Sequence, residues 1–221
     1  YIQKYGADLD ADTFADKTPE EIVEYVYNEP LFTGFQSSSI WAYTNTGDII
    51  AALMVEQATG QSFAQLMEDN VIEPLGLDNT FYEIPEETPE NLTNSYVNQL
   101  NQPGKPRRNE TDDEIRNIRA FGASAGAFSN AEDVARFQEA LFEGELVNSS
   151  SLNELVNFVD TGLSGKQRYG LGILETPDKE STPWGKIWSF VGNSFASDSL
   201  SYYLPDDGGY VNTVLTNGKD A

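Results

Sequence analysis

The spacing of hydrophobic and polar positions changes along the chain. Up to about residue 158, apolar residues recur at intervals of three and four, as on one face of an α-helix. From residue 169 they alternate with polar residues, as in half-buried β-strands. Helices are predicted over 18–28, 48–58, 63–71 and 129–142, and strands over 169–174, 186–191, 200–204 and 210–216. Helices followed by an antiparallel sheet indicate an α+β fold.

Local signals at several element ends support these ranges. Thr18 precedes Pro19 and two glutamates, a typical helix start because proline fits the first position and acids favour the positive end of the helix dipole. Gly60 is expected to end the second helix. A turn at 205–208 predicts a hairpin between the last two strands.

A weak boundary lies near residue 165, where a glycine-containing stretch separates the helical from the strand periodicity. We expect residues 1–165 to form a mostly helical lobe and residues 166–221 an antiparallel sheet portion. A chain of 221 residues is long enough for two such lobes within one domain. The sheet is expected to have three main strands.

The composition narrows the possible chemistry. The chain contains no cysteine and no histidine, which excludes thiolate sites, histidine-based zinc sites and Ser-His-Asp triads. Acid–base chemistry must then use Lys, Tyr, Asp or Glu. No metal or organic cofactor is implied, and no apolar run reaches the roughly 18 residues of a membrane span.

The chain is strongly acidic, with 36 acidic against 13 basic residues and a net charge of −23. Such a charge repels phosphate backbones, so we expect no nucleic-acid partner. Two interpretations of the acidity stay open: the heavily hydrated surface of a protein from a high-salt (halophilic) organism, or an ordinary acidic exported protein.

Several segments occur in an order that is typical of one superfamily. They are 18–21 (Thr-Pro-Glu-Glu), 43–47, 58–63, 73–77, 125–137, 169–172 and 203–217. On these segments the chain resembles the penicillin-recognising serine hydrolases, namely class C-type β-lactamases, D-Ala-D-Ala carboxypeptidases and related esterases. The resemblance implies a β-lactamase/transpeptidase-like fold, a small-molecule or peptide substrate, and an exported, periplasmic or extracellular protein. The family's closing helix has no counterpart in the chain.

The family's chemistry uses a Ser-x-x-Lys nucleophile, a Tyr-x-Asn loop and a Lys/His-x-Gly strand. Tyr43 and Asn45 match the second element, so the resemblance makes Tyr43 the proton shuttle and Asn45 the donor to the substrate amide. Alternatively, Asn45 caps the following helix. Ser-x-x-Lys does not occur among the 221 residues, and we expect it upstream.

The third element is altered, because its position falls on Phe190-Val191-Gly192. The resemblance makes Gly192 and Ser194 substrate-binding residues on the strand that faces the Tyr43 loop. Phe190 can neither bind a substrate carboxylate nor donate a proton, which affects carboxypeptidase and β-lactamase activity more than esterase activity. Alternatively, Gly192 is a glycine required by close packing.

Two functions follow from these residues. The first is a serine hydrolase that performs acyl transfer on D-amino-acid peptides, β-lactams or small esters, with the serine and lysine supplied from outside this sequence. The second is a non-catalytic binding or structural module on the same scaffold. The 221 residues alone are expected to be inactive, and the sequence leaves the oligomeric state open.

Overall fold

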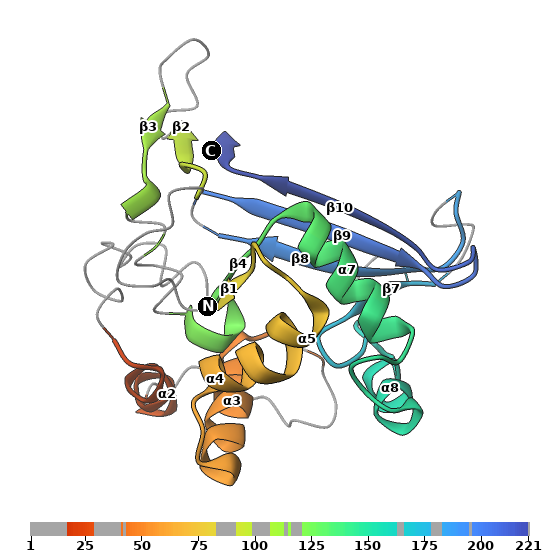
Figure 1. Ribbon diagram of the computed structural model, residues 1–221, viewed down its shortest axis with the longest axis horizontal. Helices are drawn as coiled ribbons and strands as arrows, with labels where there is room; N and C mark the ends of the chain where they lie inside the picture. The colour runs from red at the N-terminus through yellow and green to blue at the C-terminus, as the bar shows by residue number, and fades with distance from the viewer. Residues whose placement is uncertain are drawn as a thin grey trace.

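A computed structural model describes residues 17–28, 41, 43–82, 92–98, 107–112, 115, 121–162, 166–177, 183–194 and 196–220. It has an α+β fold in which a group of helices lies beside an antiparallel sheet, and helix α7 runs across that sheet (Figure 1). The predicted fold class is therefore confirmed.

The first group of helices follows the predicted periodicity. It comprises α2 (Pro19–Asn28), α3 (Asn45–Thr59), α4 (Phe63–Met67), the π-helix η1 (Glu68–Ile72) and α5 (Glu73–Leu75). At the start of α2, the Thr18 N–H donates to Glu21 Oε2 at 2.8 Å and the Glu21 N–H donates to Thr18 Oγ1 at 3.3 Å. This reciprocal capping box satisfies two backbone donors that have no partner inside the helix.

Helix α3 begins three residues earlier than the predicted range 48–58. Thr44 is its N-cap, because the Thr44 hydroxyl oxygen accepts from the Thr46 N–H at 3.2 Å. The alternative that Asn45 caps this helix is therefore wrong, since Asn45 is its first helical residue. Gly60 ends the helix in the left-handed conformation, with a φ of 71°, as predicted.

The second group consists of the 3₁₀ turn η2 (Gly122–Ser124), α7 (Ala131–Phe142) and α8 (Ser149–Leu155). Asn130 caps α7 by accepting from the Asp133 N–H at 2.8 Å. Asp133 in turn accepts from the Asn79 N–H and the Thr80 hydroxyl, each at 2.9 Å. This buried carboxylate connects the chain after α5 to the start of α7.

The main sheet has six strands in the order β10-β9-β8-β7-β6-β5, and every neighbouring pair is antiparallel. The strands are β5 (Val159–Asp160), β6 (Arg168–Tyr169), β7 (Leu174–Thr176), β8 (Ile187–Asn193), β9 (Asp198–Leu204) and β10 (Tyr210–Thr216). The three longest are β8, β9 and β10, near the predicted ranges, and β10 matches its range at both ends. The predicted single strand over 169–174 is wrong, because the chain turns between β6 and β7.

Two glycines explain this turn. Gly170 lies so close to α8 that a Cβ at this position would collide with the Leu155 carbonyl oxygen. Gly172 has a φ of 79°, a conformation that other residues adopt at a cost. The Gly170 N–H donates to the Ile173 carbonyl at 2.8 Å and closes the turn. Alternating residues alone could not reveal a turn that depends on packing against a helix.

Two small sheets complete the described structure. Strand β1 (Phe81–Tyr82) pairs with β4 (Ala127–Phe128), and β2 (Tyr96–Asn98) pairs with both β3 (Arg108–Asn109) and β11 (Gly218–Asp220). The β2–β11 pair is parallel, whereas the main sheet is wholly antiparallel. Strand β5 of the main sheet precedes residue 166, and β11 pairs with β2 in the first half of the chain. The division into two lobes at residue 165 stays a prediction.

A hydrophobic core lies between the main sheet and helices α7 and α8. The Phe142 ring centroid lies 4.3 Å from that of Tyr203, 5.1 Å from that of Trp188 and 6.0 Å from that of Phe190. Ile173, which is 1% exposed, packs in the same cluster. This core holds the main sheet in place, and the candidate site described below contacts that sheet.

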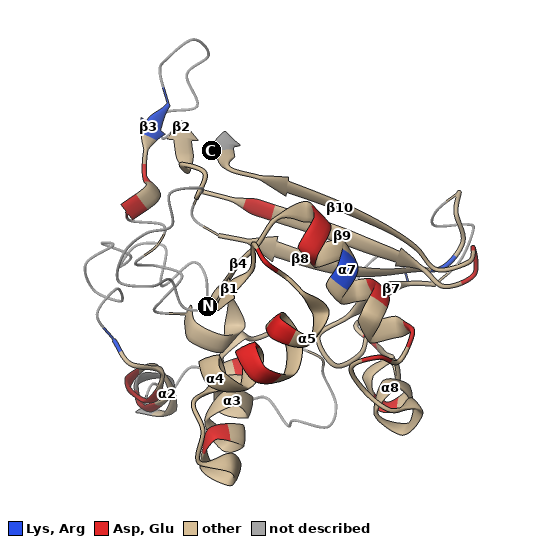
Figure 2. Cartoon of the chain, viewed as in Figure 1, with Lys and Arg blue, Asp and Glu red and all other residues tan. Residues whose placement is uncertain are grey.

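Charged residues are distributed unevenly over this fold. Asp and Glu recur along α2, α3 and α7, whereas α8 and β9 carry one each and β8 and β10 carry none (Figure 2). None of the helices in the described residues combines the length and apolar character that a membrane span requires.

Candidate functional site

Tyr43 and Asn45 lie together where the chain enters α3. The Thr44 cap lies between them, so Tyr43 immediately precedes the cap of a 15-residue helix and Asn45 is the first residue of that helix. Tyr43 is 59% exposed and Asn45 is partly buried. Within the described part of the chain, no hydrogen bond engages the Tyr43 hydroxyl or the Asn45 side-chain amide. Both polar groups are therefore available to a ligand.

A ring contact connects this loop to the sheet. The Tyr169 ring, at the end of β6, lies edge-to-face with the Tyr43 ring, with centroids 6.4 Å apart and an interplanar angle of 80°. The Trp41 ring contacts the same Tyr169 ring at 5.0 Å. The sequence analysis assigns neither Tyr169 nor Trp41 to the site. The only sequence signal for Tyr169 is that it begins 169–172, one of the segments on which the resemblance rests.

The surroundings of Tyr43 keep its hydroxyl protonated. Burial raises the pKa of Tyr43 above its ordinary value of 10.0, and the carboxylate of Asp48 raises it further. Burial also raises the pKa of Tyr169, with added contributions from Tyr43 and Asp48. Asp48 itself has a pKa raised by burial. Tyr43 therefore keeps its proton at neutral pH and can donate a hydrogen bond, and it can act as a base only beside a cation.

Ser194 lies in the turn from β8 to β9. Its hydroxyl donates to the Ser197 carbonyl at 2.9 Å, and the Ser197 N–H donates back to Ser194 Oγ at 3.1 Å. The Ser194 N–H also donates to the Ser197 carbonyl, at 2.9 Å. These bonds stabilise the turn, so a substrate would have to compete with them.

Gly192 and Phe190 have packing roles on β8. A Cβ at Gly192 would meet Ser199 Oγ on β9, so the Ser199 side chain would have to rotate to accept a larger residue. Phe190 contacts Phe142 in the core. The position that the resemblance aligns with the family's cation or imidazole is therefore a packing aromatic ring.

The strand pairing places Gly192 some way from Tyr169. Tyr169 pairs with Leu174 and Leu174 pairs with Ser189, so Tyr169 and Ser189 are two strand spacings, or about 10 Å, apart. Gly192 lies three residues, again about 10 Å, farther along β8. The loop thus meets the sheet at β6, and the predicted cleft between Tyr43 and residues 190–194 stays a prediction.

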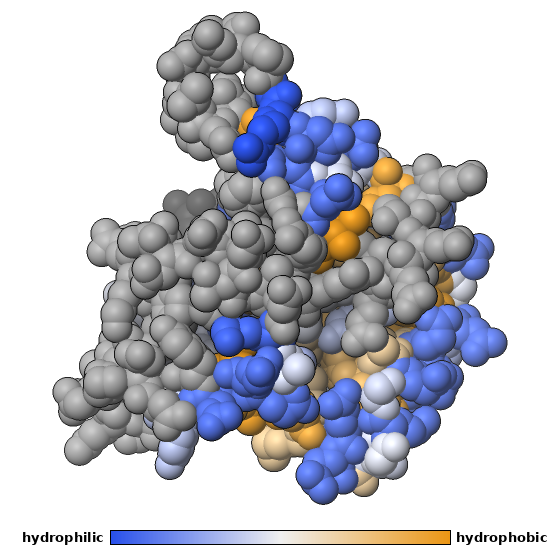
Figure 3. Space-filling model, turned by 90° about the vertical axis from the view of Figure 1, so that its left-hand side faces the viewer, coloured by the Kyte–Doolittle hydropathy of each residue, from blue (hydrophilic) through white to orange (hydrophobic). Residues whose placement is uncertain are grey.

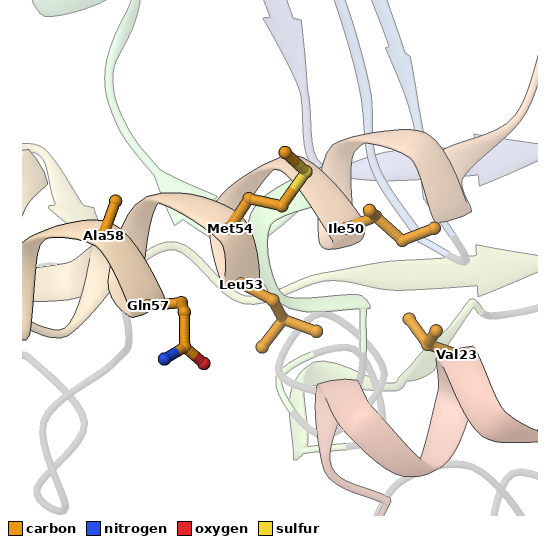
Figure 4. A pocket seen from close by; sticks show the side chains of 6 residues that line it. All are labelled: Val23, Ile50, Leu53, Met54, Gln57 and Ala58. Carbon is orange, nitrogen blue, oxygen red and sulfur yellow. The ribbon is translucent and has the colours of Figure 1, made fainter.

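An apolar hollow lies on another part of α3. It has a volume of about 440 Å³ and is lined by Val23 of α2 and by Ile50, Leu53, Met54, Gln57 and Ala58 of α3 (Figure 4). The α3 residues follow the spacing of a single helix face. Hydrophobic surface is also visible among hydrophilic residues at the bottom of Figure 3, at the height of α3 in Figure 1.

No group of three or more Asp or Glu side chains in the described ranges is arranged to hold a metal ion. The polar groups at the start of α3 are instead a phenol and a carboxamide, which donate and accept hydrogen bonds. Such groups can form hydrogen bonds to a polar ligand.

Comparison with known proteins identifies relatives of this chain. The profile of the family described as Beta-lactamase matches residues 3–221. Penicillin-binding protein 4* of Bacillus subtilis is 24% identical over 180 residues, which are 78% of this chain and 39% of that protein. The chain therefore spans about two-fifths of the length of this curated relative.

Two solved structures share the fold. A D-stereospecific amidohydrolase from Streptomyces sp. superposes with a TM-score of 0.76 at 24% identity, covering 93% of this chain and 58% of that one. A penicillin-binding protein from Bacillus halodurans superposes with a TM-score of 0.79 at 18% identity, covering 100% of this chain and 63% of that one. At these identities the likeness shows a common fold.

Proposed function

Because this chain belongs to the Beta-lactamase family, we propose that it carries the Tyr-x-Asn part of a serine acyl-transfer site. The observation that supports this proposal is the pairing of Tyr43 and Asn45 at the start of α3, where both polar groups are free of hydrogen bonds within the described residues. In the proposal, Asn45 donates to the substrate amide and Tyr43 transfers the proton.

The nucleophile and the activating cation are proposed to lie outside these 221 residues, because the sequence contains no Ser-x-x-Lys. The serine oxygen attacks the substrate carbonyl, while the lysine and Tyr43 move the serine proton to the leaving group. Backbone amides stabilise the oxyanion, and water then releases the acyl group. An ammonium beside Tyr43 would oppose the effect of Asp48 on its pKa.

The proposed substrates are D-amino-acid peptides or amides, β-lactams and small esters. The packing of Phe190 in the core favours esters and amides over substrates whose carboxylate needs a cation at that position. The mechanism requires no metal or organic cofactor. We further propose that the protein is exported and is periplasmic or extracellular, as the resemblance to penicillin-recognising serine hydrolases implies.

A second function, a non-catalytic binding module, is favoured by the same ring, because Phe190 removes a group that the family's chemistry uses. Covalent labelling with a fluorescent penicillin separates the two functions. The product of the whole gene is expected to be labelled and its Tyr43→Phe variant to be labelled more slowly, whereas the 221 residues alone should stay unlabelled. A whole-gene product that neither reacts with penicillin nor hydrolyses p-nitrophenyl esters would support the binding module.

A further inference from the structure

Tyr169 approaches the candidate site from the opposite half of the chain. It is separated from Tyr43 by 126 residues, yet its ring contacts both Tyr43 and Trp41. Trp41 and Tyr43 both precede α3, so Tyr169 contacts two aromatic rings of the segment that leads into this helix.

The backbone of Tyr169 has little freedom. Tyr169 pairs with Val159 on one side and with Leu174 on the other. The residues that follow are attached to α8, because the Leu171 N–H donates to the Leu155 carbonyl at 3.0 Å. Only a glycine fits at position 170 against that carbonyl. The backbone that carries the Tyr169 ring is thus held by strand pairing on both sides.

We propose that Tyr169 is a positioning residue for Tyr43: its ring restricts the Tyr43 side chain to one orientation and so sets the direction of the Tyr43 hydroxyl. The proposal rests on the function proposed above, in which that hydroxyl carries a proton. Tyr43 precedes its helix and is 59% exposed, so without a neighbouring ring its side chain would populate several rotamers. An edge-to-face ring pair restricts this freedom and leaves the hydroxyl open to a ligand.

The electrostatic surroundings agree with this geometry. Partial burial is the largest cause of the raised pKa of Tyr43, and among the described residues Tyr169 is the ring that lies against it. Tyr43 also raises the pKa of Tyr169, because ionisation of one phenol disfavours ionisation of the other. The two tyrosines should therefore titrate as a coupled pair.

The test uses the 221-residue chain with tyrosines labelled with ¹³C at the ring carbon that bears the hydroxyl. The signal of Tyr43 among the 11 tyrosines is assigned as the one lost in Tyr43→Phe. Its titration and its nuclear Overhauser contacts to the other rings are then measured in the parent chain, Tyr169→Phe and Tyr169→Ala. We expect Tyr169→Ala to lower the Tyr43 midpoint toward 10 and to abolish its ring contacts, whereas Tyr169→Phe keeps both.

Tyr210→Ala is the matched control, because this exposed tyrosine is on β10 at the far edge of the same sheet. Tyr169→Leu, which retains an apolar side chain on β6, replaces the alanine variant if that variant does not fold. The proposal is overturned if removal of the ring leaves the Tyr43 titration and contacts unchanged, or if Tyr169→Phe disturbs them as much as Tyr169→Ala. None of these measurements requires turnover, so a failure of the proposed enzyme activity would be detected separately, by penicillin labelling.

Discussion

The two helical regions of this protein differ in how completely they are packed. Helices α7 and α8 lie on the main sheet, and the Phe142 ring is surrounded there by three aromatic rings of β8 and β9. Helix α3 buries Ile49 and Ala52 on one face, whereas its second apolar face is an open hollow against α2. A helix that is apolar on two faces is typical of the interior of a larger structure.

This difference separates the main source of stability from the proposed chemistry. The region of α7, α8 and the sheet supplies the core, whereas the region of α2 and α3 carries Tyr43 and Asn45 beside an uncovered apolar surface. Local stability within one protein follows the amount of buried apolar contact. We therefore expect substitutions in the first region to unfold the chain and substitutions on the open face of α3 to change little.

The largest effect is expected for Phe142→Ala. This substitution removes a ring that contacts Trp188, Phe190 and Tyr203, and such core truncations cost about 3–5 kcal/mol. The free energy of unfolding, measured by urea denaturation, should fall by that amount. A loss below about 1 kcal/mol would show that the sheet region is not the main source of stability.

How far the sequence predicts this fold depends on the kind of signal. The alternation over 210–216 is sufficient to locate β10, because one face of that strand is partly buried and the other is exposed. To predict where α3 starts, one must know whether Thr44 or Asn45 caps the helix, and both residue types are good caps. The break within 169–174 depends on contact with α8, which is outside any local pattern.

The candidate site is predictable to a similar extent. A local motif singles out Tyr43 and Asn45, and the structure places both at the start of one helix. Tyr169 contributes through a contact across 126 residues, which no spacing rule reveals. The Ser194 hydroxyl is engaged with Ser197, and the sequence does not show which serines are occupied by turn bonds.

The next largest effect is expected from added salt, because the whole chain carries a net charge of −23. Between 0.1 M and 1 M salt the Debye length falls from about 10 Å to about 3 Å, which screens self-repulsion. The melting temperature should rise by about 2–4 °C for each kcal/mol of repulsion removed. We expect amide hydrogen exchange to slow more in α2 and α3, whose last turns carry no basic residue, than in β8 and β10. An unchanged melting temperature in molar salt contradicts the high-salt interpretation.

A smaller effect is expected from Asp48→Asn. Burial and then Asp48 raise the pKa of Tyr43, so removing this carboxylate should lower the Tyr43 titration midpoint. A phenol with a raised folded-state pKa stabilises the fold below its unfolded value of 10.0, and this stabilisation is lost as the pH rises through the folded-state value. The variant should therefore lose less stability above pH 10, measured by denaturation at several pH values. An equal alkaline loss in both proteins would show that Asp48 does not act on Tyr43.

The smallest effect is expected for Met54→Ala on the open face of α3. Met54 is 66% exposed and Ile49, on the same helix, is 2% exposed, so the two residues form a matched pair. Ile49→Ala should cost about 2–5 kcal/mol, because it leaves a cavity. Met54→Ala should stay within about 0.5 kcal/mol, since a surface substitution removes little contact and alanine is a strong helix former. The two urea midpoints measure this difference. A large loss in Met54→Ala would mean that the hollow between α2 and α3 is covered in solution, and the contrast between the two helical regions would then disappear.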